Sequence, residues 1–207
     1  MPNGQAQCHK ECSSDGGITA LGARDGMELG IKRGAAKRSL GKIIWCADSE
    51  DLIAGVGAEP LQMHADDRGF FVELARLGST GLAGRISSPE SQIQVSATLT
   101  YPGTIKAIHY HYRQADLWTP VVGMFQVFLH DLRRSSATFG LTNTLYVGVF
   151  RPWLILIPPG VAHGYKVLGT RPALLVYLTN RYYDPEDEGR LPYDHQDIGY
   201  DWTTQHK

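Results

Sequence analysis

The stretch GTIKAIHYHYRQADLWTPVVG, residues 103–123, carries the most informative pattern in this chain of 207 residues. Its β-branched and aromatic residues alternate with polar ones, as expected for a β-strand. Alternate side chains of a strand share a face, so His109 and His111 should point the same way, about 7 Å apart at Cα. Asp116 follows beyond the next turn. The stretch therefore predicts either a metal site or a histidine that exchanges a proton with a substrate.

The rest of the chain after about Asp51 consists of short strand-like runs. Runs rich in β-branched and aromatic residues recur between Gly or Pro residues at a spacing of roughly 8–12 residues, which is typical of an all-β sandwich or barrel. One run, WLILI (residues 153–157), is apolar at every position, so we expect a central strand there. Pro158 and Pro159 should end it, since proline cannot donate to the hydrogen-bond ladder.

Composition narrows the class of protein. Apolar residues make up 43% and charged residues 20%, as in ordinary soluble domains, and the net charge of -1 gives no reason to expect a nucleic acid or a membrane as partner. No apolar run approaches the ~20 residues of a membrane-spanning helix. The cysteines, Cys8, Cys12 and Cys46, are too few for a disulfide framework, so we expect a cytoplasmic protein.

The beginning of the chain differs from the remainder. Residues 1–47 are rich in Gly, Ser, Lys and Arg and have little hydrophobic periodicity. We expect a weakly ordered arm or a short helix there, followed by a single β domain over residues 48–207.

Two motifs in the chain resemble those of the cupin superfamily. The first motif consists of Gly103, His109, His111, Asp116 and Gly123, and its spacings all match those of the cupin motif. At the position of Asp116 most cupins have Glu. The second appears in part as PPGVAH, which ends at His163. The resemblance implies an all-β double-stranded β-helix, or jelly-roll barrel, in which His109, His111, Asp116 and His163 converge. Imidazoles with one carboxylate suit Zn, Fe, Mn or Ni.

A longer resemblance runs from Asp66 to Trp202. The segments DDRGFFVEL, QIQVS, GTIKAIHYH, VFLHDLRRSSATFG, IPPGVAHGYKVL, VYLTNRYYDPEDEG and DIGYDW occur in this order along the chain. In order and spacing they resemble the nucleotide-sugar 3,5-epimerases that act on dTDP-4-keto-6-deoxyglucose, a cupin-fold family that works without a metal. The resemblance implies a homodimeric isomerase that inverts carbon 3, carbon 5 or both of a nucleotide-linked 4-keto-6-deoxy sugar.

The same resemblance implies roles for individual residues. His109 would be the base that removes the proton next to the 4-keto group, and Tyr177 would be the acid on the opposite face of the sugar. Asp131 would orient a pocket histidine through a hydrogen bond to its ring. The implied substrate contacts are Arg68 and Lys106 for the diphosphate, and Phe70, Glu73, Gln92 and His163 for the nucleotide and sugar.

Two positions depart from the epimerase family, and both departures favour a metal site. The family has a lysine in place of Asp116 and usually a glutamine in place of His111. Its late aspartate, which pairs with the catalytic histidine, would lie beyond DIGYDW, and we expect it to be absent. Two alternatives therefore stay open: a divalent-metal cupin enzyme that acts on a small carbonyl compound or sugar, and a non-catalytic protein that binds a sugar nucleotide.

Overall fold

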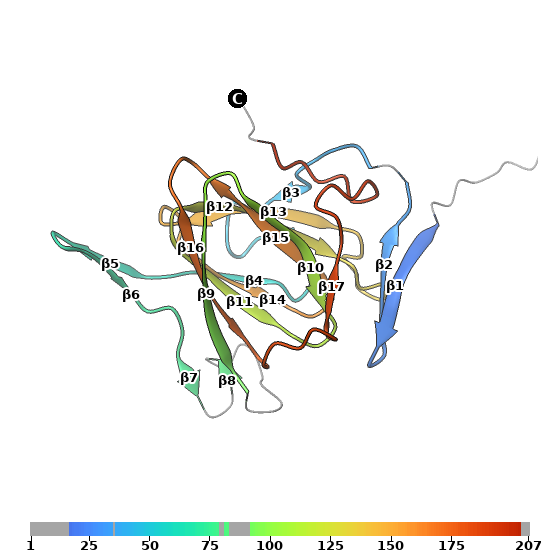
Figure 1. The fold of residues 1–207 in the computed structure, drawn as a ribbon, viewed down its shortest axis with the longest axis horizontal. Coiled ribbons are helices and arrows are strands. Elements are labelled where there is room, and N and C mark those ends of the chain that lie inside the picture. The colour runs from blue at the N-terminus through green and yellow to red at the C-terminus, as the bar shows by residue number, and fades with distance from the viewer. Residues whose placement is uncertain (1–16, 35, 79–80, 83–91, 204–207) are drawn as a thin grey trace, which may run out of the picture.

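The structure, a computed structural model, describes residues 17–34, 36–78, 81–82 and 92–203 (Figure 1). Within these ranges the chain forms strands and turns, and no helix is long and apolar enough to cross a membrane. The strands are β1 (Ile18–Arg24), β2 (Met27–Lys32), β3 (Lys42–Ile43), β4 (Gly57–Pro60), β5 (Met63–Asp66), β6 (Gly69–Val72), β7 (Leu77–Gly78), β8 (Gly81–Leu82), β9 (Gln94–Thr100), β10 (Ile105–His111), β11 (Asp116–Val122), β12 (Met124–Asp131), β13 (Thr142–Gly148), β14 (Trp153–Ile157), β15 (Val161–Leu168), β16 (Ala173–Thr179) and β17 (Glu188–Arg190). The all-β prediction is confirmed.

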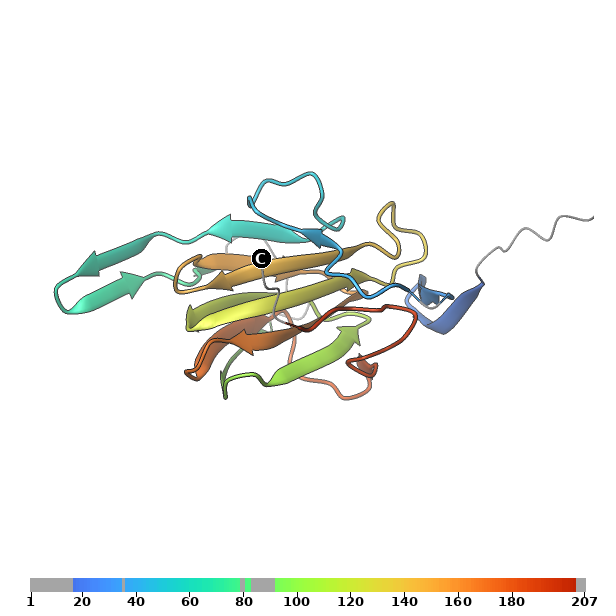
Figure 2. The ribbon, with the colours of Figure 1, turned by 90° about the horizontal axis from the view of Figure 1, so that it is seen from above.

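Two sheets build the barrel and lie as layers, one over the other (Figures 1 and 2). The larger sheet has the strand order β17-β10-β15-β12-β13-β3, and the smaller has the order β4-β14-β11-β16-β9. Neighbouring strands are antiparallel except β3, which pairs parallel to β13. The predicted central strand WLILI is β14, which lies between β4 and β11 and ends at Ile157, as expected. This arrangement is the predicted jelly-roll barrel.

The main hydrophobic core lies between the two sheets. Phe125 of β12 and Leu145 of β13 enter it from the larger sheet, while Ile155 of β14 and Leu175 of β16 enter it from the smaller one. Each of these side chains is at most 2% exposed. Their burial holds the two sheets together and fixes the walls of the space between them.

A second apolar cluster covers the outer face of the larger sheet. Ile108 of β10 and Phe128 of β12 face outward and belong to one cluster with Leu29 and Ile31 of β2. The ring centroid of Phe128 lies 4.6 Å from that of Tyr200, near the C-terminal end of the described chain. Segments from both ends of the chain therefore support the back of the sheet that contains β10 and β15.

The N-terminal arm differs from our expectation of a weakly ordered segment or short helix. Its described residues form the hairpin β1–β2 and the strand β3, and Leu29, Ile31 and Ile44 are at most 1% exposed. Gly30 donates a backbone hydrogen bond to Leu132 O at 2.9 Å. Leu132 lies about a hundred residues after Gly30 in the sequence. The periodicity of the arm alone therefore could not predict that the arm packs there. Residues 1–16 lie outside the described part.

The hairpin β5–β6 projects away from the barrel (Figures 1 and 2). Its strands pair from Met63 and Val72 at the base to Asp66 and Gly69 at the tip. Phe71 is 67% exposed although it is a large apolar residue. The hairpin therefore contributes little to the core of its own barrel.

Candidate active site

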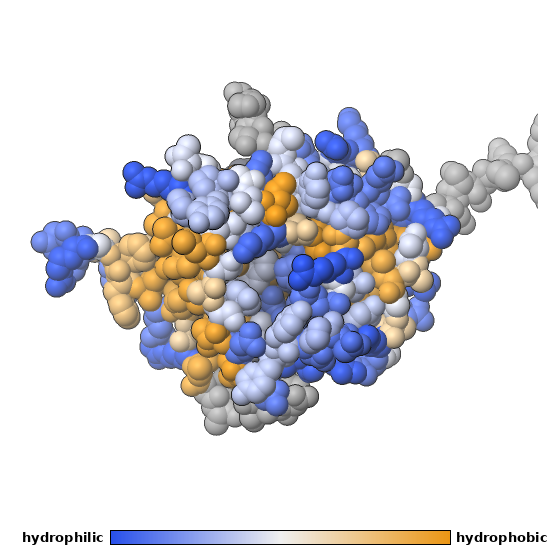
Figure 3. Space-filling model, viewed as in Figure 1, coloured by the Kyte–Doolittle hydropathy of each residue, from blue (hydrophilic) through white to orange (hydrophobic). Residues whose placement is uncertain are grey.

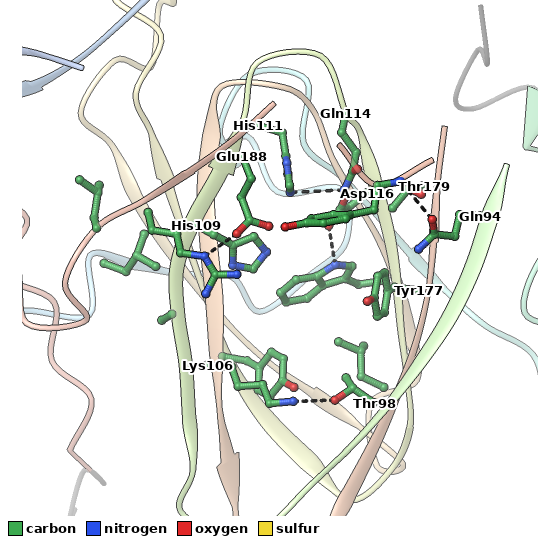
Figure 4. Close-up of a pocket in the computed structure, with 18 of the residues that line it drawn as sticks. Gln94, Thr98, Lys106, His109, His111, Gln114, Asp116, Tyr177, Thr179 and Glu188 are labelled. Carbon is green, nitrogen blue, oxygen red and sulfur yellow. Dashed lines mark hydrogen bonds and ion pairs between the residues drawn. The ribbon is translucent and has the colours of Figure 1, made fainter. Parts of the chain in front are cut away.

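A cavity of about 660 Å³ opens between the two sheets (Figure 4). Side chains of β10 and β17 line it from the larger sheet, and side chains of β9, β11 and β16 line it from the smaller sheet. Its size falls within the roughly 300–1,000 Å³ that is common for small-molecule sites. Groups on opposite walls can therefore face a single bound molecule from two sides.

Four polar side chains converge in this cavity region. His109 and His111 share the inner face of β10, as their alternation predicted, Asp116 begins β11, and His163 lies opposite His109 on β15. The ring centroids of His109 and His163 are 4.1 Å apart, and those of His111 and His163 are 5.7 Å apart. One ligand atom of each residue lies within 4.8 Å of those of the others. The structure brings all four residues of the predicted metal set together.

Asp116 lies at the centre of a hydrogen-bond network. The indole Nε1 of Trp118 donates to Asp116 Oδ2 at 3.0 Å, and the side-chain amide of Gln114 donates to Oδ1 at 2.7 Å. His163 Nε2 lies 3.3 Å from Asp116 Oδ2, and its Nδ1 lies 2.9 Å from Val161 O. These contacts orient both the carboxylate and the imidazole (Figure 4).

Burial sets the protonation state of His109. Burial, with a smaller effect of the neighbouring His163 and His111, holds the pKa of His109 well below its ordinary value of 6.5. Its ring is therefore neutral at pH 7, and a neutral imidazole can accept a proton. Burial alone would raise the pKa of Asp116, but the contact with His163 outweighs it and keeps that pKa below its usual range.

Tyr177 lies on the wall of the cavity opposite His109. It belongs to β16 of the smaller sheet, where it pairs in register with Trp118 of β11. His109 belongs to β10 of the larger sheet, and both side chains line the cavity. Figure 4 shows the two residues on opposite sides of the space. An acid and a base on opposite walls are what inversion at a carbon atom requires.

Charged side chains also line the cavity. Lys106 Nζ donates to Thr98 Oγ1 at 2.7 Å, and Arg190 forms an ion pair with Glu188. The side chain of Arg190 is 78% exposed, whereas that of Glu188 is only 11% exposed. The sequence analysis identified Lys106 but missed Glu188 and Arg190. Both residues belong to β17, which has only three residues and is too short to show a periodic pattern. That β17 pairs with β10, opposite His109, cannot be recognised from the local sequence.

Four of the predicted substrate-binding residues do not line the cavity of their own chain. Arg68 lies at the tip of the β5–β6 hairpin with its side chain 84% exposed, and Phe70 lies on the same hairpin. Glu73 follows the hairpin and pairs with a neighbouring arginine. Gln92 also lies outside the lining, although Gln94 on β9 belongs to it. Of the predicted contacts, Lys106 lines the cavity, and His163 contacts residues that do.

Asp131 has different partners from those we expected. Its two carboxylate oxygens accept hydrogen bonds from the guanidinium of Arg133 and from the hydroxyl groups of Ser136 and Thr138. The expected hydrogen bond to the ring of a pocket histidine is not formed among the described residues. Asp131 ends β12 and organises the turn that follows, because its oxygens face that turn and not the cavity.

The two-sheet barrel and its histidine-rich cavity define the class of protein, a cupin-type jelly roll with a site inside the barrel. Residues 51–207 match the model of the family described as dTDP-4-dehydrorhamnose 3,5-epimerase. The chain therefore belongs to this family of sugar epimerases, as its sequence motifs implied.

Individual relatives agree with this assignment. The chain is 46% identical over 156 residues to the spore coat polysaccharide biosynthesis protein SpsL of Bacillus subtilis, a match that covers 74% of this chain and 99% of SpsL. It is 36% identical over 156 residues to the probable low-salt glycan biosynthesis epimerase Agl13 of Haloferax volcanii, covering 74% and 96% of the two chains.

Solved structures show the same fold. The dTDP sugar isomerase of Desulfovibrio desulfuricans G20 superposes with a TM-score of 0.64 at 26% identity, over 72% of this chain and 92% of that one. The 3'-monoepimerase ChmJ of Streptomyces bikiniensis, solved in complex with dTDP-quinovose, gives a TM-score of 0.61 at 25% identity, over 71% and 74%.

Proposed function

We propose that this protein epimerises carbon 3, carbon 5 or both of a nucleotide-linked 4-keto-6-deoxy sugar. The observation that carries the proposal is the placement of a neutral, half-buried His109 across the cavity from Tyr177. The family and the solved relatives that act on or bind dTDP sugars support the substrate class.

The proposed reaction uses the acidity of the carbon next to the ketone. His109 removes the proton from that carbon, and the electron pair left behind forms an enolate with the 4-keto oxygen. Tyr177 then delivers its phenolic proton to the same carbon from the opposite face, and the ketone is restored. The enolate needs a hydrogen-bond donor at the 4-keto oxygen between these two steps. No change of oxidation state occurs in these steps, since the 4-keto group of the substrate already makes the neighbouring proton acidic and each step is a proton transfer.

The diphosphate of the substrate is assigned to cationic groups that line the cavity. Lys106 and Arg190 both line it, and Arg190 pairs in register with His109. A diphosphate held by these two groups leaves the sugar near His109 and Tyr177. Arg190 can exchange its contact with Glu188 for a phosphate, because its side chain is largely exposed.

We also place the enzyme in a homodimer. Strand β9 is an edge of the smaller sheet, and its outward side chains Val95 and Leu99 are 58% and 64% exposed. Figure 3 shows apolar surface in the region of β9 and β16. A second copy over this surface would remove an exposed edge and an apolar patch. Such a copy would also account for the predicted nucleotide contacts of Arg68 and Phe70.

Deuterium exchange tests the epimerase. The protein is incubated in D2O with dTDP-4-keto-6-deoxyglucose, and deuterium at carbons 3 and 5 is followed by NMR. We expect wash-in with wild type and none with His109→Ala. With Tyr177→Phe we expect wash-in without inversion, because His109 can still remove and return a proton on one face.

The matched control is Tyr183→Phe, since Tyr183 lines the same cavity but has no assigned role in proton transfer. It should keep both exchange and inversion. Full epimerisation by Tyr177→Phe would show that another group is the acid. Tight binding of the sugar nucleotide with no exchange by wild type would identify a binding protein instead of an enzyme.

A further inference from the structure

We propose that His109, His111, Asp116 and His163 form a binding site for one divalent transition-metal ion. The inference goes beyond the proposed epimerase function, because it rests on the arrangement of ligand atoms and not on any substrate. The four residues come from the strands β10, β11 and β15. Figure 4 shows His109, His111 and Asp116 directed toward a common space.

The distances within the cluster fit an ion. One ligand atom from each residue lies within 4.8 Å of the others. Ligand atoms about 2.0–2.2 Å from a zinc-like ion lie roughly 3–4 Å from one another. The pair of His163 Nε2 and Asp116 Oδ2 is already at such a separation, 3.3 Å. Small rotations of the side chains are therefore enough to close the set around an ion.

The contact between His163 and Asp116 suits a metal ion. Val161 O can only accept a hydrogen bond, so His163 Nδ1, 2.9 Å away, carries the hydrogen. In the neutral ring Nε2 then has a lone pair, and it faces an oxygen of Asp116 that also has only lone pairs. Two lone pairs that face each other at this distance repel. A metal ion bound to both atoms would turn this repulsion into two coordination bonds.

Two further features of the cluster favour a metal. His111 Nδ1 and His163 Nε2 are buried without a hydrogen-bond partner, in residues that are only 4% and 2% exposed. A buried polar atom without a partner destabilises a fold, and coordination removes that penalty. Asp116 is held in turn by Gln114 and Trp118, and metal-bound carboxylates are usually held by such outer hydrogen bonds.

The donor set indicates the kind of ion. Three imidazoles and one carboxylate suit zinc, iron, manganese or nickel, whereas calcium and magnesium prefer oxygen ligands. The contacts that the described residues make with Asp116 include no Lys or Arg ion pair. No lysine or arginine among these contacts therefore neutralises the carboxylate. A bound ion of charge +2 would meet no repulsion from such a side chain there.

Direct metal binding to the full chain, without an affinity tag, tests the proposal. The protein is stripped with a chelator, dialysed into metal-free buffer and titrated with Zn²⁺ by calorimetry. Mass spectrometry of the metal content gives the stoichiometry, and the visible spectrum with Co²⁺ reports nitrogen ligands. Because cysteine thiolates are zinc ligands in general, all proteins carry Cys8→Ser and Cys12→Ser, so that any site measured lies elsewhere.

We expect one tightly bound Zn²⁺ per chain, and about 100-fold or greater loss of affinity in His111→Gln and in Asp116→Asn. Trp118→Phe, which removes the outer hydrogen bond to Asp116 and part of a buried core ring, should weaken binding by about 10-fold. The matched control is His130→Gln, since His130 is equally buried but lies outside the cluster.

Two results would overturn the metal site. One is the absence of stoichiometric Zn²⁺ and Co²⁺ binding by the chain that carries Cys8→Ser and Cys12→Ser and has all four cluster residues intact. The other is unchanged affinity in both His111→Gln and Asp116→Asn, provided that both variants unfold cooperatively like wild type. Neither result bears on the epimerase, because deuterium wash-in is measured separately with the sugar nucleotide.

Discussion

Asp116 and Asp131 are two buried carboxylates of one barrel, 3% and 0% exposed, and their surroundings differ in one respect. Asp131 accepts hydrogen bonds from a guanidinium, that of Arg133, as well as from hydroxyl groups. Asp116 accepts hydrogen bonds from the uncharged Gln114 and Trp118 and has an imidazole as its remaining contact. The chain supplies a permanently charged partner, Arg133, for Asp131, but the contacts of Asp116 include no lysine or arginine.

This difference separates a structural carboxylate from a candidate functional one. A buried ion pair with complete hydrogen bonding gives a fixed turn, because neither partner can leave without exposing a buried charge. A buried carboxylate among neutral donors and histidines can bind an added cation or respond to a substrate. Burial alone, which the two residues share, does not distinguish the two roles.

Replacing Asp131 should have the largest effect. Asp131→Ala leaves the guanidinium of Arg133, whose side chain is 17% exposed, without its partner. We expect the free energy of unfolding to fall by about 3–5 kcal/mol, measured by urea denaturation, with Zn²⁺ binding unchanged in the folded fraction. The control Glu28→Ala breaks an exposed ion pair with Arg134 and should change stability by less than about 1 kcal/mol. Equal losses in both variants would contradict the comparison.

Low pH should destabilise the fold because His130, the neighbour of Asp131 in the sequence, becomes protonated on unfolding. Burial is the main cause that lowers the pKa of His130 from 6.5 to about 4, while Asp131 opposes the shift and Lys32 and His195 add to it. The unfolded chain therefore binds more protons between pH 6.5 and pH 4, so stability falls as the pH falls through this window. The full loss is about 3 kcal/mol for a shift of this size.

The pH dependence is measured by urea denaturation at several pH values, in wild type and in His130→Gln. The variant has no imidazole to protonate, so its stability should fall less over the same window. If the two proteins lose stability in parallel, His130 is not the cause of the acid sensitivity.

Zinc bound at the cluster that contains Asp116 should slow the exchange of substrate protons for deuterium. A metal ion that uses the lone pair of His109 leaves the ring unable to accept a proton. We expect one equivalent of Zn²⁺ to slow deuterium wash-in by about 10-fold or more, equivalent to about 1.4 kcal/mol, and a chelator to restore it. If deuterium wash-in continues at an unchanged rate while the ion is bound, His109 cannot be both a metal ligand and the base. One of the two roles would then be wrong.

Asp116→Asn should have the smallest effect, when stability is measured in the presence of a chelator. The amide of Gln114 can turn over to accept a hydrogen bond from the new amide, and Trp118 keeps an oxygen as its acceptor. We expect a change of less than about 1 kcal/mol in the free energy of unfolding, because no fixed cation loses its partner. A loss as large as that of Asp131→Ala would show that Asp116 is structural.

The sequence predicted those features that depend on local patterns. The alternation around His109 and His111 indicated a shared face, and the apolar run at residues 153–157 indicated a central strand; both are confirmed. The convergence of Asp116 and His163 with these histidines was implied by the resemblance to the cupin motifs, and the structure brings the four residues together. The first two predictions rest on strand geometry, and the third rests on the resemblance.

Other features depend on contacts that no local pattern carries. Arg190 faces His109 only because β17 pairs with β10 at one register. Asp131 resembled a catalytic carboxylate in sequence, but Arg133, two residues later, takes both of its oxygens. Gln114 lies three residues after His111 without any sign that its amide would reach Asp116. Such side-chain choices are set by tertiary packing, which the order of residue types does not reveal.

Residues 17–34 and 36–50 lie outside the family match but not outside the folded unit. Leu29 and Ile31 cover the back of the strands that carry His109 and His163, and Ile44 enters the core between the sheets. The limit of sequence homology is therefore not a limit of the structural domain in this protein. A chain shortened to the homologous part would leave an apolar face of the larger sheet in contact with water.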